Sequence, residues 1–328
     1  MRPTAEDVLA GKKVLVVGSL NLDHHLRTDG EPSDDGTARV VSYSTAGGGH
    51  AGNGATALAR LGCDVSIFTV VGADSDGDRL LDELAGAGIQ TGLAVRMETA
   101  TTGQVFIPAF PTRHYMLMFR GATDAWPPET CDTVPFAGFD AVLLFDPAPA
   151  VLPGVVAGAR AAGVPVYWNP GGLRSPADGV LTTAAQVRRL LVNRAEFVQL
   201  FGVSPSPLSA STVCRRHRIR QLVVTLGAEG AMAVDGTSVW TVGARPAQVV
   251  SPAGAGDAFA AASTAADLVG EGIGGALQWG VAAGGHAVTT PGTRDDSLTL
   301  KWLLDAVATR RERHTSFAPA PGKRKERR

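Results

Sequence analysis

Residues 251–262 read Ser-Pro-Ala-Gly-Ala-Gly-Asp-Ala-Phe-Ala-Ala-Ala, a turn of small residues that runs into an Ala-rich apolar segment. This pattern predicts a helix with one acid, Asp257, at its start. Gly254 and Gly256 lack the side chains that would keep a ligand away from the backbone. An anion could then meet the amides of Gly254, Ala255 and Gly256 at the positive end of the helix dipole.

An acid beside an anion site suits one reaction well, in which it accepts the proton of a hydroxyl that attacks a phosphate. Phosphoryl transfer otherwise needs donors for the transferred oxygens and a metal ion. Asp257 is therefore the candidate catalytic base, and Gly254, Ala255 and Gly256 are the candidate anion hole. The alternative is that Asp257 is an ordinary N-cap residue behind a Gly-rich turn.

The composition is that of a globular protein of one large domain. Of the 328 residues, 45% are hydrophobic and 19% charged, and the formal net charge is −1. This balance gives no attraction to nucleic acid or a membrane surface, so neither partner is expected. The three scattered cysteines favour neither disulfides nor a zinc site. The polar first residues and the lack of a long apolar run predict a cytoplasmic protein.

Short apolar strands alternate with Ala- and Leu-rich helices along the chain. The segment 141–145 is apolar throughout, as expected of a strand that is covered on both faces. The alternation predicts an α/β fold with a mostly parallel sheet, with ligands bound at the carboxyl ends of the strands. Strands are predicted at 13–18, 65–71, 140–145, 164–168, 189–193, 221–226 and 231–235. Helices are predicted at 51–61, 76–87, 151–162, 195–201, 209–217, 257–269 and 273–288.

Two segments, 24–45 and 102–121, break this rhythm with alternating or aromatic residues and turns, which predicts additional β structure. They would be either ordinary surface hairpins or parts of a separate small sheet. Residues 310–328 hold two basic runs, 310–313 and 323–328, with a Pro- and Ala-rich stretch between them, so we expect a disordered tail there.

Four further motifs accompany residues 251–262 in a fixed order. They are Asn21-Leu22-Asp23, Ala46-Gly47-Gly48-Gly49-His50-Ala51-Gly52-Asn53, Asn193-Arg194-Ala195-Glu196 and Val223-Val224-Thr225-Leu226-Gly227-Ala228-Glu229-Gly230. Together they resemble the ribokinase-like sugar kinase family of the phosphofructokinase-B type, over residues 12–305. The resemblance implies a three-layer α/β/α fold in a kinase domain of residues 1–309, with ATP and Mg2+. It also implies that segments 24–45 and 102–121 form a small β-sheet lid, which in the family often serves as a dimer surface.

The resemblance assigns the sugar to residues at two strand ends and one helix start. Amide and acid side chains there supply donors and acceptors for vicinal hydroxyls. Without the resemblance, the acids would be read as turn residues and the helical amide as a surface residue. His50 stands where ribokinase itself has a lysine, which argues against strict ribose specificity. The implied sugar-binding residues are Asn21, Asp23, Gly48, Gly49, Asn53 and Asp146.

The resemblance also implies which residues bind the nucleotide. It implies that Asn193 approaches the phosphates and that Glu196 organises Mg2+ through water. The alternative is a helix N-cap with a capping-box Glu three residues later. The nucleotide would also lie near Thr225, Gly227 and Gly230. Residues 251–252 are Ser-Pro where many members carry Asp-Thr, so K+ activation is expected to be weak or absent.

The leading hypothesis is ATP-dependent phosphorylation of a hydroxymethyl group on a pentose, ketohexose or related sugar. A nucleoside kinase of the same fold is an alternative, because Phe106, Tyr115 and Phe119 are available for a base pocket. A non-catalytic sugar- or nucleotide-binding regulator is a second alternative, although such a protein would have no need of Asp257. A dehydrogenase is disfavoured because the glycine run 47–54 does not follow the first strand.

Overall fold

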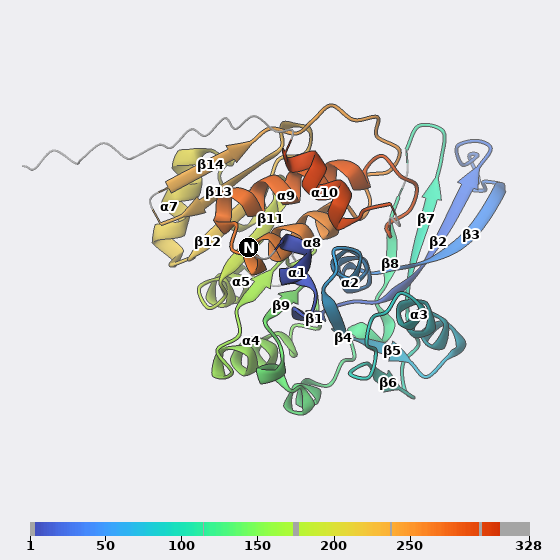
Figure 1. The fold of residues 1–328 in the computed structure, drawn as a ribbon. Helices are drawn as coiled ribbons and strands as arrows, with labels where there is room; N and C mark the ends of the chain where they lie inside the picture. Colours follow the sequence, from blue (N-terminus) through green and yellow to red (C-terminus); the bar gives the residue numbers. More distant parts are fainter. Residues whose placement is uncertain (1–3, 114, 173–176, 237, 295–296, 309–328) are drawn as a thin grey trace, which may run out of the picture.

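The computed structural model describes residues 4–113, 115–172, 177–236, 238–294 and 297–308 (Figure 1). Within these ranges the main sheet has eight strands in the order β14-β13-β12-β11-β10-β9-β1-β4. All neighbouring pairs from β4 to β12 are parallel, whereas β13 runs antiparallel to both of its neighbours, β12 and β14. The strands are β1 (Lys13–Val17), β4 (Asp64–Phe68), β9 (Ala141–Leu144), β10 (Val166–Trp168), β11 (Arg189–Asn193), β12 (Gln221–Thr225), β13 (Ala231–Asp235) and β14 (Ser238–Val242).

Helices cover both faces of this sheet, which confirms the predicted layers (Figure 1). Strand β1 shows why, since Val14 and Val16 pack into one hydrophobic cluster and Leu15 and Val17 into the other. The first cluster lies under α1 (Ala5–Leu9), α2 (His50–Arg60), α8 (Ala255–Leu268), α9 (Gly272–Ala287) and α10 (Leu300–Ala308). The second lies under α4 (Leu152–Ala161), α5 (Ala177–Ala184), α6 (Arg194–Phe201) and α7 (Pro207–His217).

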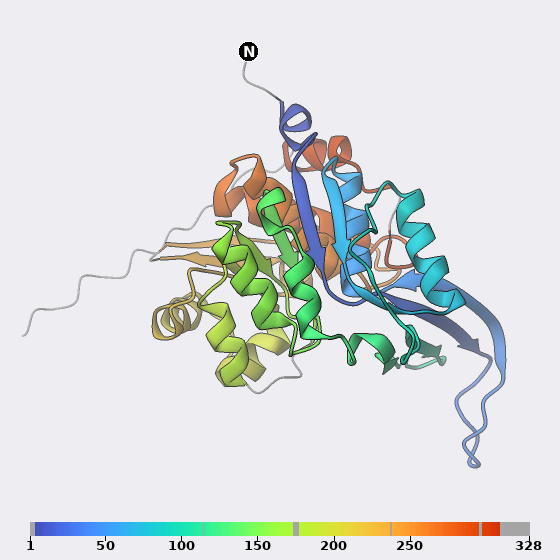
Figure 2. The same ribbon diagram turned by 90° about the horizontal axis from the view of Figure 1, so that it is seen from below.

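A smaller sheet projects from the main body on the side of α2 and α3 (Ser75–Gly86), as Figure 2 shows. Its order is β3-β2-β7-β8, and it consists of β2 (Asn21–Thr28), β3 (Val40–Gly48), β7 (Gly103–Ala109) and β8 (Leu117–Phe119). The prediction of separate β structure in the two interrupting segments is therefore confirmed. A short parallel pair, β5 (Val70–Gly72) and β6 (Val95–Met97), lies beside it. The 3-10 helices are η1 (Gly121–Thr123), η2 (Pro128–Thr133), η3 (Phe136–Gly138) and η4 (Gly227–Glu229).

Every predicted strand and helix is present near its predicted bounds, with one split. The segment 65–71 divides at Thr69 into β4 and β5, because β5 leaves the main sheet to pair with β6. The sequence analysis missed α1, α5, α10, β6 and β14, which are all elements of nine residues or fewer. The predicted tail, 310–328, lies outside the described residues. In the part of the chain that is described, we find no helix with the length and apolar character needed to cross a membrane.

A buried ion cluster ties the main sheet to the last turn of α8. Arg189 at the start of β11 has a fully buried side chain, and its Nη2 donates to Asp267 Oδ1 at 2.9 Å. Its other nitrogens donate to Gln221 Oε1 at 3.0 Å and to Ser263 at 3.1 Å. Tyr167 and Arg188 donate to the second oxygen of Asp267. A buried guanidinium is tolerated only when it is paired in this way.

The substitution Asp267→Ala is expected to lower the free energy of unfolding by about 3–5 kcal/mol, because it leaves the charge of Arg189 buried without its partner. Urea denaturation would measure this. The matched control is Asp305→Ala, which removes an exposed partner of Lys301 on α10 and should leave the midpoint almost unchanged. Equal midpoints for the two variants would contradict a stabilising role for the cluster.

Candidate functional site

A cleft of 430 Å3 opens where the carboxyl ends of the parallel strands meet the smaller sheet. This is the location that the α/β pattern predicts for a ligand. Most of the predicted site residues line it together, although they come from distant parts of the chain. These are Asn21, Asp23, Gly49, Asn53, Asp146, Asn193, Glu196, Thr225, Gly254, Gly256 and Asp257. Gly48, Ala255, Gly227 and Gly230 are not among the lining residues.

The first backbone amides of α8 are left without a capping side chain among the described residues. Gly254 is the N-cap residue, with the left-handed φ of 77° that favours glycine, and a Cβ there would lie 2.7 Å from the carbonyl oxygen of Thr293. No side chain among the described residues caps this helix. The first amides of a helix have no partner within the helix, so here they remain available to an anion. Asp257 lies in the first turn and is not the N-cap, so the simple capping alternative is wrong.

Both oxygens of Asp257 accept hydrogen bonds from the first turn of α2. His50 Nδ1 lies 2.8 Å from Oδ1, and Asn53 Nδ2 donates to Oδ2 at 2.8 Å. The side chain of Asp257 is only 5% exposed, whereas that of His50 is 39% exposed. Burial by itself lowers the pKa of His50, but the negative charges of Asp257, Asp146 and Glu196 outweigh it and raise that pKa well above its ordinary value. A cationic His50 therefore faces Asp257 at neutral pH.

The sequence analysis considered His50 only as a substitution in the sugar pocket. The structure instead pairs it with the candidate base, a contact between residues 207 positions apart. No local pattern could signal this pairing. Asn53 was predicted as a sugar ligand, and in the structure its amide nitrogen is committed to Asp257, while its Oδ1 is buried without a hydrogen-bond partner among the described residues.

The opposite wall of the cleft is formed by the first residues of β2. Asn21 pairs in register with Gly48 of β3, and a Cβ at Gly48 would lie 2.1 Å from Asp23 Oδ2. Glycine at 48 thus makes room for the carboxylate of Asp23. Within the described chain, Asn21 Oδ1 and Asp23 Oδ1 are buried and accept no hydrogen bond. Buried acceptors are rarely left unpaired, so these atoms are suited to the hydroxyls of a ligand.

Burial raises the pKa of Asp23 to about 6, although the positive charges of Arg294, His50 and His24 act in the opposite direction. Arg294 was not anticipated from the sequence. Its Nη2 donates to the carbonyl oxygen of Gly48 at 2.9 Å, and its Nη1 lies 3.7 Å from Glu83 Oε2. Arg294 therefore fixes the backbone of β3 next to Asp23 and brings a positive charge to this wall.

Asp146 lines the cleft, but its carboxylate is already engaged. Oδ2 accepts from Arg120 Nη1 at 2.7 Å, and Oδ1 accepts from the amide of Ser19 at 3.1 Å. Both ion-pair side chains are 8% exposed. The sequence analysis missed Arg120, which follows β8 and has no motif of its own. A direct role for Asp146 in binding sugar remains a prediction.

Asn193 and Glu196 form the capping box that was the alternative reading of this motif. Asn193 Oδ1 accepts from the Glu196 amide at 2.9 Å, and Glu196 Oε2 accepts from the Asn193 amide at 2.8 Å. Glu196 Oε1 accepts from the amide of Gly172 at 2.9 Å. Each carboxylate oxygen can accept a second bond, so contact with a metal-bound water remains compatible with this geometry. No group of three or more acids, histidines or cysteines in the described ranges could hold a metal alone.

Gly227 and Gly230 have backbone reasons to be glycine. Their φ angles are 64° and 95°, and they frame the 3-10 helix η4. A Cβ at Gly230 would lie 2.0 Å from the carbonyl oxygen of Val242. Thr225, at the end of β12, does line the cleft. A nucleotide role for Gly227 and Gly230 remains a prediction.

Comparison with known proteins places this geometry in a family. The model of the pfkB family carbohydrate kinases matches residues 11–300. The chain belongs to this family. The predicted carbohydrate kinase is thereby confirmed, and in this kinase the carboxylate Asp257 lies at the start of α8.

Two curated relatives and one solved structure are similar over most of this kinase. The ATP-dependent ribose-1-phosphate kinase of Halopiger xanaduensis is 29% identical over 86% of this chain and 94% of its own. The ribokinase of Haemophilus influenzae is 26% identical over 90% of this chain and 98% of its own. The structure of Arabidopsis thaliana ribokinase complexed with ribose and ATP has a TM-score of 0.81 at 24% identity, and covers 90% of this chain and 99% of that one. This last likeness confirms the predicted fold.

The raised pKa of Asp23 predicts a pH-dependent KM for the carbohydrate. Below about pH 6 the carboxylate takes up a proton and loses an acceptor, so KM should rise about tenfold between about pH 7 and about pH 5. Steady-state kinetics would show this, and Asp23→Asn should abolish the dependence. The control Asp82→Asn changes an exposed acid on α3 and should retain it. A KM that is flat with pH in the unmodified enzyme would contradict the assignment.

Proposed function

We propose that this kinase transfers the γ-phosphoryl group of ATP to a hydroxymethyl group of a pentose, ketohexose or related carbohydrate. The observation that carries the proposal is Asp257, which lies at the uncapped start of α8 and faces unpaired buried acceptors across the cleft. Among the relatives, one is named an ATP-dependent ribose-1-phosphate kinase and another a ribokinase. These names support ATP as the phosphoryl donor and a carbohydrate as the acceptor.

Asp257 acts as the general base in this proposal. It accepts the hydroxyl proton while the carbohydrate oxygen forms a bond to the γ-phosphorus and the bond from that phosphorus to ADP breaks. The amides of Gly254, Ala255 and Gly256 donate to the oxygens of the transferred group. His50 and Asn53 hold the carboxylate from two sides, which leaves one acceptor site on each oxygen for the substrate.

The carbohydrate is held from both walls of the cleft. The acceptors of Asn21 and Asp23 bind hydroxyls from the β2 side, and Gly49 with Asn53 Oδ1 lies on the α2 side. We assign Asp146 as a positioning residue that fixes Arg120 and the turn at Ser19. Asp146 also lines the cleft, so its carboxylate can contact the sugar directly.

The nucleotide lies on the side of Asn193 and Thr225, with Glu196 next to the metal. Mg2+ supplies charge neutralisation of the phosphates when bound. Because Glu196 already accepts two amide hydrogen bonds, we propose that it reaches the ion through water. Ser251 Oγ accepts from the amide of Ala253 at 3.3 Å and brings no negative charge, so weak or absent K+ activation is still expected.

The smaller sheet has two proposed roles. It carries Met118 and Phe119 into the cleft wall, which suits a lid over the carbohydrate. It also exposes a set of large apolar side chains that a second copy of the chain would cover in a homodimer. These include Val40, Val41, Tyr43 and Leu117. We propose that the kinase works in the cytoplasm, where its three buried cysteines would stay reduced.

One observation favours the nucleoside kinase alternative. Met116, Met118 and Phe119 line the same cleft as the sugar residues, and an apolar wall suits a planar base. The other two aromatic candidates are engaged elsewhere. Phe106 stacks on His24 at 4.6 Å between ring centroids, and Tyr115 packs against Phe110 at 5.9 Å.

The test is ADP release with ATP and Mg2+ over pentoses, ketohexoses, sugar acids, ribose 1-phosphate and nucleosides. One substrate class should stimulate release. Asp257→Asn should lower kcat about a hundred- to ten-thousand-fold, because it removes the proton acceptor. The charge-matched control Asp305→Asn on α10 should keep full activity. Full activity in Asp257→Asn would overturn the assigned base, and silence over the whole panel with ATP bound would favour the regulator hypothesis.

A further inference from the structure

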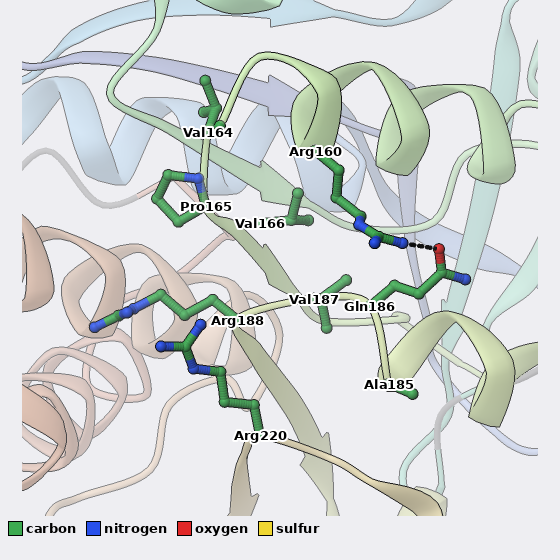
Figure 3. A pocket seen from close by; sticks show the side chains of 10 residues that line it. Arg160, Val164, Pro165, Val166, Ala185, Gln186, Val187, Arg188 and Arg220 are labelled. Atoms are coloured by element: carbon green, nitrogen blue, oxygen red, sulfur yellow. Dashed lines mark hydrogen bonds between the residues drawn. The ribbon is translucent and has the colours of Figure 1, made fainter.

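Figure 3 shows a second hollow, which is lined by residues at the amino ends of the parallel strands. Its volume is 490 Å3, and it is formed by the loops that lead into the neighbouring parallel strands β10, β11 and β12. The cleft lies at the carboxyl ends of these strands and the hollow at their amino ends. The two sites therefore share no residue.

Each of the segments that lead into these strands contributes one arginine to the hollow. Arg160 is in the last turn of α4, and Arg188 and Arg220 come directly before β11 and β12. The parallel register pairs Leu190 with Leu222, so Arg188 and Arg220 occupy matching positions two residues earlier. Neighbouring strands are about 4.8 Å apart, which brings two like charges close together.

The positive charge in the hollow is not balanced by acids. None of the described residues that line it is Asp or Glu. Arg188 Nε donates to Asp267 Oδ2 at 2.7 Å, but that carboxylate also serves the buried Arg189. Arg160 pairs only with a neutral group, Gln186 Oε1, at 2.7 Å, and Arg220 makes no hydrogen bond or ion pair within the described chain. Asp267 is thus shared by Arg188 and Arg189, and neither Arg160 nor Arg220 has a carboxylate partner within the described chain.

Two of the arginines are held in place while most of their donors stay unused. Figure 3 shows the bond from Arg160 to Gln186 on one side of the hollow, and the extended side chains of Arg188 and Arg220 on the other. A guanidinium offers five donors, and those of Arg160 and Arg188 are each bound through one nitrogen. Fixed donors lose less entropy when they bind, and the planar fork matches phosphate oxygens.

The floor between the arginines is apolar. Val164, Pro165, Val166 and Val187 line it, and the volume lies in the range typical of small-molecule sites. An anionic group could therefore contact the arginines while a small organic body rests on these side chains.

We propose that this hollow is a second binding site, separate from the catalytic cleft, for a small metabolite that carries a phosphoryl group. Such a group could belong to a sugar phosphate, to a nucleotide or to free phosphate. The site is connected to the catalytic helix, since Asp267, the partner of Arg188, lies ten residues after Asp257 on α8, about 15 Å along the helix axis.

Calorimetric titration of the full-length protein with inorganic phosphate, ribose 5-phosphate and ADP tests the proposal. The variant is Arg160→Gln with Arg220→Gln, which spares Arg188 and its contact with Asp267. The matched control is Arg215→Gln with Arg216→Gln, which removes two exposed charges from the last turn of α7 nearby. The catalytic cleft contributes equally to all three proteins, because none of these residues lines it.

The unmodified protein and the control should bind at least one probe about tenfold or more tightly than the variant does. The probe that shows the largest difference identifies the source of the phosphoryl group. Equal binding of all three probes to all three proteins would overturn the proposal. Arg220→Gln alone removes no contact, so it repeats the test without risk to folding. Binding is measured directly, so the result does not depend on kinase activity.

Discussion

The structure depends on the pairing of one buried carboxylate. Asp257 has almost no contact with solvent, and a charge in that position must be compensated by neighbouring groups. His50 and Asn53, both in the first turn of α2, provide this at 2.8 Å each. These two hydrogen bonds fix the start of α2 against the start of α8. They also aim the free amides of α8 at the place where a phosphoryl group would lie.

The far end of α8 is fixed by a second carboxylate. Asp267 binds Arg189 at the start of β11, so the helix is held to α2 at one end and to the main sheet at the other. Asp257, the proposed catalytic base, therefore keeps its orientation without support from a ligand. The parallel strands then place Asn193 and Thr225 at the same edge of the sheet. The proposed reacting groups are thus held in place by packing, and the smaller sheet supplies one side of the cleft.

The sequence was sufficient for what local pattern controls. The alternation of apolar segments predicted the layered sheet, and residues 251–262 located the start of α8 and its acid. Side chains that act across the fold could not be found in this way. Arg294 reaches Gly48 over 246 positions, and Arg120 reaches Asp146 over 26. For Glu196 the sequence could not decide between two roles. A capping box and the N-x-x-E motif of the family place the same residue types at the same spacing.

The most direct test of this account is the titration of the His50 imidazole, followed by NMR in the unmodified protein and in Asp257→Asn. If the carboxylate and the imidazolium are paired as described, the pKa of His50 lies well above its ordinary value and falls when Asp257 loses its charge. An ordinary pKa for His50 that is the same in both proteins would contradict the pairing on which the site depends.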